Sequence, residues 1–449
     1  MEKQTAAIAG GGLVGSMLAL YMARAGYNVE VFERRPDMRT TQGYQGRSIN
    51  LALSDRGWLS LKELGLEERI REIALPMHGR MLHQPDGAVT FQPYGKGEQA
   101  IYSVSRSAIN MALMDAAEAH PSVTFHFEHR CEAVQFDQRQ VRFSGPDGST
   151  QTRNPNLLFG ADGAFSATRL SKQLGSDFFQ YQQYYIDCGY KELHIPAGPN
   201  GTFLLDPNAL HIWPRGKFMM IALPNPGGDF TCTLFFPFEG PSGFNTLSTP
   251  EVVKPFFEEH FADAVPLMPT LLEDFFRNPT SSLVTVKCFP WVYQDWFGLI
   301  GDAAHAIVPF FGQGMNCGFE DCRVLNGLVA EHNHNWSAIM PAYEDLRKPD
   351  GDAIADLAIQ NFEEMSNRVA DPRFLLQKKI EAWFHDRHPD AWIPAYTQVA
   401  FSPQIRYSEA LANGRRQEAI MQEVLALPGI EHDWQTETVE RLMQSRIES

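Results

Sequence analysis

Three glycines near the N-terminus have types and spacing that could bind a phosphate group. Gly10, Gly12 and Gly15 form the pattern Gly-x-Gly-x-x-Gly between an apolar run at 5–9 and a helical pattern at 13–24. The first glycine would permit a tight turn, the second would let the backbone approach a pyrophosphate, and the third would allow close helix–strand packing. The first helical turn would add free N–H groups and the positive end of its dipole. The pattern predicts a dinucleotide site.

A carboxylate follows this turn at the distance typical of a ribose contact. Glu33 closes the second strand-like run, at 28–32, about twenty residues beyond the glycines. Its carboxylate can accept hydrogen bonds from ribose hydroxyls but would repel a ribose phosphate. The sequence therefore favours FAD or NAD over NADP as the dinucleotide bound here.

Two further Gly-Asp clusters follow apolar runs later in the chain. Residues 160–163 read Gly-Ala-Asp-Gly, residues 301–305 read Gly-Asp-Ala-Ala-His, and a second glycine-rich turn lies at 312–316. An isolated Asp-Gly pair is usually a tight turn with a capping Asp. A strand end followed by such a turn and a helix also suits the ribityl chain and ring carbonyls of a flavin. Asp302 could then accept a hydroxyl hydrogen bond, while we interpret His305 as structural.

The elements that must position these motifs alternate as in an α/β protein. Residues 5–33 read as strand, helix and strand, whereas a strand-rich region with Pro/Gly turns predicts an inserted, mainly antiparallel sheet. The fold class predicted is a Rossmann-like FAD-binding domain with an inserted β-sheet substrate domain and a C-terminal helical segment. The expected divisions are 1–177 and 289–364 for the FAD-binding domain, 178–288 for the substrate domain, and 365–449 for helices covering the active site.

Composition argues against two classes of partner. The chain has 38 basic and 54 acidic residues, and its formal net charge is −16. A surface this acidic has no electrostatic footprint for a nucleic-acid backbone and would be repelled by anionic lipid headgroups. The uncharged run 4–23 contains the glycine turn, so we interpret it as part of the nucleotide fold and expect no membrane span. The six cysteines form no Cys-x-x-Cys pair, so we expect reduced thiols in a cytoplasmic protein without a metal site.

Taken together, the three motifs resemble those of the single-component class A flavoprotein monooxygenases. The resemblance covers roughly residues 5–365. It implies an enzyme that keeps FAD tightly bound, uses NADPH as a transient reductant, and uses molecular oxygen as co-substrate through a flavin C4a-hydroperoxide. The sequence holds no second Gly-x-Gly-x-x-Gly, which agrees with the lack of a separate NADPH domain in that family.

Longer stretches resemble the kynurenine 3-monooxygenase family within that class. They are 46–53, 190–193, 208–214 and 309–316, and the match continues through Asn361, Met365 and the segment 393–396. The resemblance implies hydroxylation of L-kynurenine to 3-hydroxy-L-kynurenine, a step of tryptophan degradation. Eukaryotic members carry a C-terminal membrane anchor, and the last residues here resemble none, so we expect a soluble protein. The oligomeric state is left open.

The resemblance also assigns a substrate site. Arg80 and Tyr94 would hold the substrate carboxylate with help from Asn361 and Tyr396, and the planar Arg fork suits that group. The remaining assigned substrate contacts are apolar: Leu210, Met219, Ile221, Leu223, Phe235, Pro309, Phe310 and Met365. No catalytic acid or base is assigned, because the ring amine already activates the neighbouring carbon.

The cofactor contacts implied by the resemblance extend beyond the glycine turn. Cys131 would contribute only its backbone, and Arg106 lies at the start of a helical pattern, where a cation suits a pyrophosphate. The full set is Gly10, Gly12, Leu13, Val14, Gly15, Glu33, Arg34, Ala52, Arg106, Cys131, Asp302, Met315 and Asn316.

Two alternative functions stay open at this point. One is a class A hydroxylase of another aromatic acid, such as salicylate, in which Arg80, Tyr94 and Tyr396 would serve another purpose. The other is a non-catalytic FAD-fold binding protein, like the inhibitors that escort small GTPases. NADPH oxidation stimulated by a substrate would separate an enzyme from the second alternative.

Overall fold

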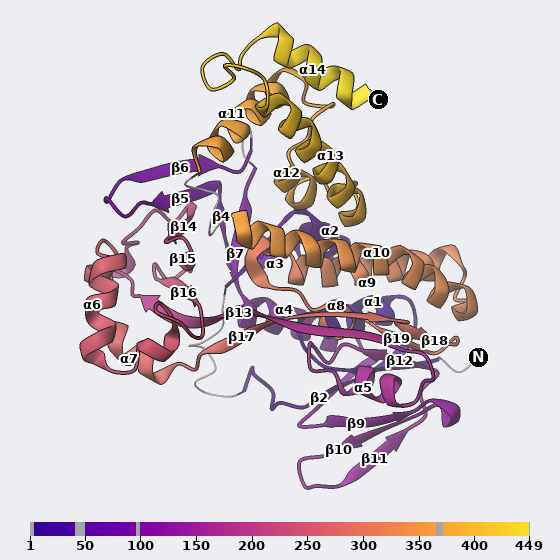
Figure 1. Ribbon diagram of the computed structural model, residues 1–449. Coiled ribbons are helices and arrows are strands. Elements are labelled where there is room, and N and C mark those ends of the chain that lie inside the picture. The colour runs from indigo at the N-terminus through magenta and orange to yellow at the C-terminus, as the bar shows by residue number, and fades with distance from the viewer. Residues whose placement is uncertain (1–3, 41–49, 96–98, 365–370, 449) are drawn as a thin grey trace.

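The computed structural model describes residues 4–40, 50–95, 99–364 and 371–448 (Figure 1). A six-stranded sheet has the order β18-β19-β12-β1-β2-β8 and is parallel except at β18. The predicted first strand, helix and second strand are confirmed as β1, α1 and β2. The elements of this layer are β1 (Thr5–Ala9), α1 (Leu13–Arg24), β2 (Asn28–Glu33), β8 (Val123–Phe127), β12 (Leu157–Gly160), β18 (Val292–Tyr293) and β19 (Phe297–Leu299).

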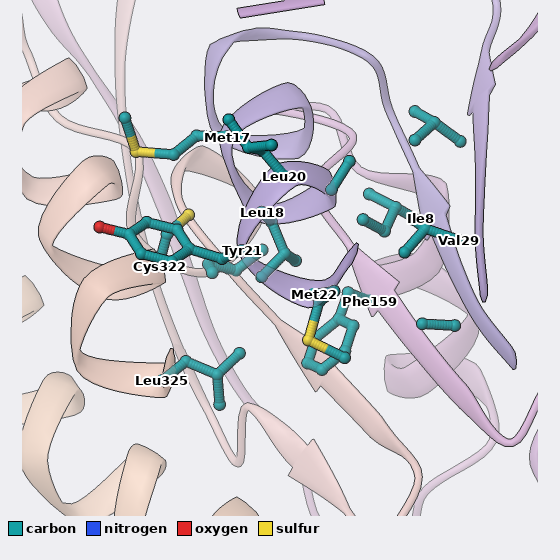
Figure 2. Packing of buried hydrophobic residues seen from close by; sticks show 14 of the residues in the cluster. Ile8, Met17, Leu18, Leu20, Tyr21, Met22, Val29, Phe159, Cys322 and Leu325 are labelled. Atoms are coloured by element: carbon teal, nitrogen blue, oxygen red, sulfur yellow. The ribbon is translucent and has the colours of Figure 1, made fainter. Parts of the chain in front are cut away.

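Helix α1 is buried on nearly every side. Figure 2 shows Leu18 and Met22 packed toward Ile8 and Phe159 of the sheet, while Leu325 of α9 (Gly314–Glu331) lies on another side. A helix that is apolar all round belongs to a protein interior or a membrane. Here it is interior, which accounts for the uncharged run that contains the glycine turn. Within the part of the chain that the structure describes, none of the helices combines the length and the apolar composition of a membrane span.

A second, seven-stranded sheet has the order β17-β13-β16-β15-β14-β5-β6. Its pairs are antiparallel except β14–β5, so the prediction of a mainly antiparallel sheet is confirmed. Two of its strands, β5 and β6, precede residue 178, and the division of the chain by residue range stays a prediction. The strands are β5 (Gly79–His83), β6 (Val89–Pro93), β13 (Gln180–Ile195), β14 (Ala209–Pro214), β15 (Met219–Pro224), β16 (Phe230–Phe236) and β17 (Ser281–Phe289).

The two faces of this sheet pack against different partners. Side chains such as Trp213 and Phe236 pack against α6 (Pro250–His260) and α7 (Leu271–Arg277). Their strand neighbours Ile212 and Phe235 belong to a separate cluster with α10 (Trp336–Glu363). Alternation along each strand thus divides the side chains between a packed outer face and an inner face.

Smaller elements surround the two sheets, and the C-terminal helices form a cluster of their own. That cluster lies at the top of Figure 1 and joins the rest of the molecule where α13 contacts α10. The remaining elements are β3 (Asn50–Leu53), α2 (Asp55–Glu63), α3 (Glu67–Arg71), β4 (Ala74–Met77), β7 (Ile101–Ser105), α4 (Arg106–Glu118), β9 (Arg130–Gln135), β10 (Gln140–Ser144), β11 (Thr150–Arg153), α5 (Ala167–Leu174), α8 (Asp302–His305), α11 (Pro372–Arg387), α12 (Ala395–Ala400), α13 (Tyr407–Leu425) and α14 (Glu437–Glu448).

Candidate active site

The glycine turn, both Gly-Asp motifs and the inner face of the seven-stranded sheet meet in one cavity of about 660 Å³. Its walls come from the β1–α1 turn, from β3, from the loops at 161–165 and 306–315, and from strands β5 and β14 to β17. The cavity therefore has a dinucleotide end near α1 and a substrate end against the sheet. A long cavity shared by two layers suits an extended cofactor beside a small substrate.

The glycine turn at the dinucleotide end leaves no room for side chains at two positions. Gly10 has a φ of +106°, and a Cβ there would lie 2.3 Å from the carbonyl oxygen of Ala161. A Cβ on Gly15 would lie 1.9 Å from the carbonyl oxygen of Gly10. At Gly12, by contrast, a Cβ would meet nothing within 4 Å. The open position lines the cavity, so the backbone there is accessible to a pyrophosphate.

Glu33 is held by the same turn. Gly11 N donates to Glu33 Oε2 at 2.8 Å, and the backbone N and Nε of Arg35 donate to Oε1 at 3.0 and 2.8 Å. Burial raises the pKa of Glu33, but the hydrogen bonds and charge of Arg35 outweigh it and the net pKa is lowered. The carboxylate is therefore ionised at neutral pH and lines the cavity as an acceptor for hydroxyl groups.

The two Gly-Asp motifs shape the middle of the cavity in different ways. Asp162 accepts hydrogen bonds from the backbone N and Oγ1 of Thr168, at 3.0 and 2.8 Å, so its carboxylate caps the start of α5. Gly301 has a φ of +61°, and a Cβ there would lie 2.9 Å from Cγ2 of Val14. The second motif thus packs directly on the first turn of α1 and leaves Asp302 in the cavity wall.

The N-terminus of α9 faces the cavity through Gly314 and Met315. Asn316 fixes this end: its Nδ2 donates to the carbonyl oxygens of Ala52 and Gly312 at 2.8 and 2.9 Å. Its Oδ1 accepts from Ser54 N at 2.9 Å. The side chain is therefore occupied in joining α9 to β3. The first-turn N–H groups of α9 can face a flavin ring that carries negative charge.

The substrate end holds a cation between two tyrosines. The Arg80 guanidinium carbon lies 5.4 Å from the Tyr94 ring centroid and 4.9 Å from that of Tyr396. Within the described part of the chain, Arg80 Nε and Tyr94 Oη are buried without a hydrogen-bond partner. Burial raises the pKa of both tyrosines, so their hydroxyls stay protonated. A guanidinium N–H and a tyrosine hydroxyl left unpaired in a cavity wall fit a carboxylate.

Apolar side chains complete this end. Met219, Ile221 and Leu223 alternate along β15 and line the cavity, as one face of a strand requires. Phe235 from β16 lies 5.0 Å, centroid to centroid, from Phe310 in the loop that precedes α9. The walls can therefore hold an aromatic ring between the sheet and residues 306–313, here called the flavin loop.

Most of the predicted site residues line this cavity. The predicted cofactor contacts found there are Gly10, Gly12, Leu13, Val14, Glu33, Arg34, Ala52, Arg106, Cys131, Asp302 and Met315. The predicted substrate contacts found there are Arg80, Tyr94, Leu210, Met219, Ile221, Leu223, Phe235, Pro309, Phe310 and Tyr396. The contact of each with a bound ligand stays a prediction.

Four predicted residues are not found in the lining. Gly15 and Asn316 lie behind it, in the tight packing described above. Asn361 donates from Nδ2 to the carbonyl oxygen of Phe310 at 2.6 Å, so it supports the flavin loop. Met365 lies outside the described residues, as do positions 46–49 of the stretch that resembles the family.

Some lining residues were missed by the sequence reasoning. Phe311 lines the cavity and stacks on Tyr396 with ring centroids 5.3 Å apart. Thr233 lies two residues before Phe235 on β16 and also lines the cavity. The period of two along a strand was a signal for Thr233. The Phe311 contact joins segments far apart in sequence, and the local pattern carries no signal for it.

His305 lies outside the cavity, in a buried ion-pair network. Its Nε2 lies 2.6 Å from Asp321 Oδ2, and Arg347 Nε lies 2.7 Å from Asp321 Oδ1. Within the described residues, one group of side chains brings possible metal-ligating atoms close together. It consists of His305, Cys317 and Asp321. Arg347 supplies a positive charge that compensates the Asp321 carboxylate, and its Nη2 also lies 3.4 Å from Cys317 Sγ. The arrangement is that of a structural network.

The fold and the cavity are those of an FAD-binding protein. The chain matches the family described as "FAD binding domain" over residues 3–221 and 290–358. Among solved structures, it is similar to a tetrameric form of 2-methyl-3-hydroxypyridine-5-carboxylic acid oxygenase, with a TM-score of 0.67 and 18% identity. That similarity covers 90% of this chain and 98% of the other, and it shows the fold.

Two relatives assign the chain to one family of FAD-binding proteins. The kynurenine 3-monooxygenase of Flavobacterium psychrophilum is 50% identical over 440 residues, which cover 98% of this chain and 97% of that protein. The kynurenine 3-monooxygenase of Flavobacterium johnsoniae is 49% identical over 435 residues, covering 97% and 96%. The chain belongs to the kynurenine 3-monooxygenase family.

Proposed function

We propose that this chain hydroxylates L-kynurenine to 3-hydroxy-L-kynurenine, with FAD bound in the cavity, NADPH as reductant and molecular oxygen as co-substrate. Membership of the family supports the reaction and its cofactors. One observation carries the substrate: Arg80, half-buried between Tyr94 and Tyr396 and with its Nε unpaired within the described residues, closes the apolar end of the cavity. L-kynurenine has a carboxylate at one end and an aromatic ring at the other, which matches this order of groups.

The residues at the dinucleotide end fit FAD. The first turn of α1 would bind the pyrophosphate with Arg106, and Glu33 would accept hydrogen bonds from the adenosine ribose. Asp302 would accept from the ribityl chain, and the N-terminus of α9 would face the ring. When bound and reduced by NADPH, FAD activates molecular oxygen and supplies the electrophilic oxygen atom.

The protein's own contribution at the substrate end is to orient the ring and exclude water. Arg80 would hold the substrate carboxylate in a charge-assisted pair, and the hydroxyls of Tyr94 and Tyr396 would donate to it. The apolar walls on β15 and β16 would then place the ring against the flavin loop. No general base is needed, because the ring amine already donates electrons to the carbon that is hydroxylated.

The test is NADPH oxidation by the flavin-loaded protein, with and without L-kynurenine, together with product analysis. Strong stimulation with 3-hydroxykynurenine as product would support the proposal. Stimulation without hydroxylated product would mean that kynurenine is only an effector. The absence of stimulation would favour another aromatic acid, and then the non-catalytic alternative.

We also infer that the protein acts in the cytoplasm. All six cysteines are free thiols and are buried. Free thiols are typical of a reducing compartment. Fractionation of the source cells, followed by activity measurement in each fraction, tests this inference.

A further inference from the structure

Two histidines lie behind the substrate end, on the sheet face that packs against α6. His83 ends β5, His211 lies in the adjacent strand β14, and they are 5% and 2% exposed. His83 Nε2 lies 2.9 Å from His211 Nδ1. His211 Nε2 lies 2.9 Å from the carbonyl oxygen of Asp206, and His83 Nδ1 lies 2.7 Å from Asp263 Oδ2. These four groups form one hydrogen-bonded series, here called the histidine chain.

The histidine chain needs one more proton than two neutral rings carry. The Asp206 carbonyl oxygen only accepts, so His211 Nε2 must donate to it. A neutral His211 then accepts at Nδ1 from His83 Nε2. Three contacts need three hydrogens, whereas two neutral imidazoles supply two. The contact between His83 Nδ1 and the Asp263 carboxylate therefore requires a third proton.

The position of this third proton follows from the groups around Asp263. Trp213 Nε1 donates to both carboxylate oxygens of Asp263, at 2.9 and 3.0 Å, which favours the ionised carboxylate. Burial lowers the pKa of His211 to about 4, so that ring is neutral at neutral pH. The third proton therefore belongs to His83, which is an imidazolium when the chain is complete.

The surroundings hold this proton weakly. Burial lowers the pKa of His83 and the charge of Arg215 lowers it too, whereas the hydrogen bond and charge of Asp263 raise it. The net pKa lies below the ordinary 6.5. Within the described residues, the two rings also act on each other, and Asp206 acts on His211. His83 therefore loses its proton as the pH rises through a value below 6.5, and the contact with Asp263 then lacks its hydrogen.

Strand β5 connects the histidine chain to the substrate end. Arg80 lies three residues before His83 in this five-residue strand, so its side chain is on the opposite, cavity-lining face. The β5–β6 hairpin is at the edge of the sheet, and β5 pairs with β14 from Gly79 to Leu82. The His83–His211 contact adds a side-chain link across that pair. Because β5 carries Arg80, a shift of this strand against β14 would move the guanidinium relative to the rings of Tyr94 and Tyr396.

We propose that His83, His211 and Asp263 are positioning residues for the substrate: the proton shared by His83 and Asp263 ties β5, through Asp263 and its hydrogen bond from Trp213, to β14 and thereby sets Arg80 for the carboxylate. The inference rests on the proposed function, since it takes the L-kynurenine carboxylate as the partner of Arg80. Substrate affinity then falls as the pH rises and the proton is lost.

Asp263→Asn gives the sharpest test. The introduced amide can donate to His83 Nδ1 and accept from Trp213 Nε1, so the chain is complete with two neutral rings. L-kynurenine dissociation constants would be measured by titrating the FAD-loaded proteins between about pH 5 and about pH 8, so that the range extends well below the ordinary pKa of histidine. We expect the affinity of the wild type to fall by up to about tenfold over this range. Asp263→Asn should show no change and should bind more tightly than the wild type at the upper pH.

A second readout does not depend on substrate. The nitrogen NMR shifts of the histidine side chains report whether His83 carries one proton or two. His83 should be doubly protonated in the wild type at the lower pH, and neutral throughout in Asp263→Asn. His388→Gln is the matched control, because it removes a histidine–carboxylate pair, with Glu440 at 2.7 Å, on the C-terminal helices. It should follow the wild type.

Three results have distinct meanings. The same pH dependence of affinity in the wild type and Asp263→Asn would overturn the positioning role. A neutral His83 at both ends of the pH range in the wild type would overturn the proton count. If no protein, the wild type included, bound L-kynurenine at either pH, both the proposed function and the positioning role would fail, and the nitrogen shifts would still decide the proton count.

Discussion

The two ends of the cavity are built from different parts of the polypeptide. At the dinucleotide end the backbone itself forms the wall, and Gly10, Gly15 and Gly301 fit because they lack a Cβ. At the substrate end, side chains on regular strands form the wall, among them Arg80 and Ile221. The dinucleotide end should tolerate almost no added atoms. At the substrate end, by contrast, the affinity for substrate should change gradually as single side chains are replaced. The following predictions test this contrast.

The largest effect is expected at the most crowded glycine. Gly10→Ala places a Cβ 2.3 Å from the Ala161 carbonyl oxygen at a φ of +106°, so the turn must open. The purified variant should carry almost no flavin, measured as the ratio of flavin to protein absorbance. Gly327→Ala is the control, because a Cβ at that position in α9 meets nothing within 4 Å and should leave the flavin content unchanged. Equal flavin content in the two variants would contradict the backbone account.

Removal of the cation at the other end should affect only the substrate. Arg80→Ala should retain FAD but bind L-kynurenine roughly 100-fold more weakly, because the charge-assisted pair with the substrate carboxylate is lost. Titration of the FAD-loaded variant gives the dissociation constant, and its flavin absorbance gives the FAD content. Arg80→Lys should lie between the wild type and the alanine variant, because it restores the charge without the planar fork. Normal kynurenine binding by Arg80→Ala would refute the substrate assignment.

Gly12→Ala should separate folding from cofactor binding. Its Cβ would enter open space, so the midpoint of thermal unfolding of the flavin-free protein should match that of the wild type. The same Cβ would lie where the backbone meets the pyrophosphate, and FAD affinity should fall by about tenfold or more. Unchanged FAD affinity would show that the pyrophosphate does not approach this residue.

The smallest effect is expected on the apolar wall. Ile221→Val removes one methylene from a strand face that lines the cavity, and the Michaelis constant for L-kynurenine should rise by about threefold. FAD content should not change. An effect as large as that of Arg80→Ala would mean that the wall contributes to binding as much as the cation does.

The sequence predicted the dinucleotide end better than the substrate end, for a physical reason. The turn from β1 to α1 and the ribose acid Glu33 lie within one local βαβ unit, whose spacing is set by backbone geometry. The predicted bounds of β1 and α1 match the structure because periodicity and turn residues delimit these elements.

The substrate end depends on contacts between distant segments. Strand β5 pairs with β14, and Tyr94 stacks on Tyr396 across most of the chain, which no local pattern reveals. Family resemblance supplied these residues as a set, without their geometry. It did not supply the hydrogen bond from Asn361 to the flavin loop or the histidine chain behind β5.

The most direct test of the account is a paired titration with L-kynurenine and its decarboxylated analogue kynuramine, in the wild type and in Arg80→Ala. The account predicts that the wild type prefers L-kynurenine by roughly 100-fold and that Arg80→Ala loses most of this preference. A preference that survives in Arg80→Ala would contradict it, because the carboxylate would then be bound elsewhere.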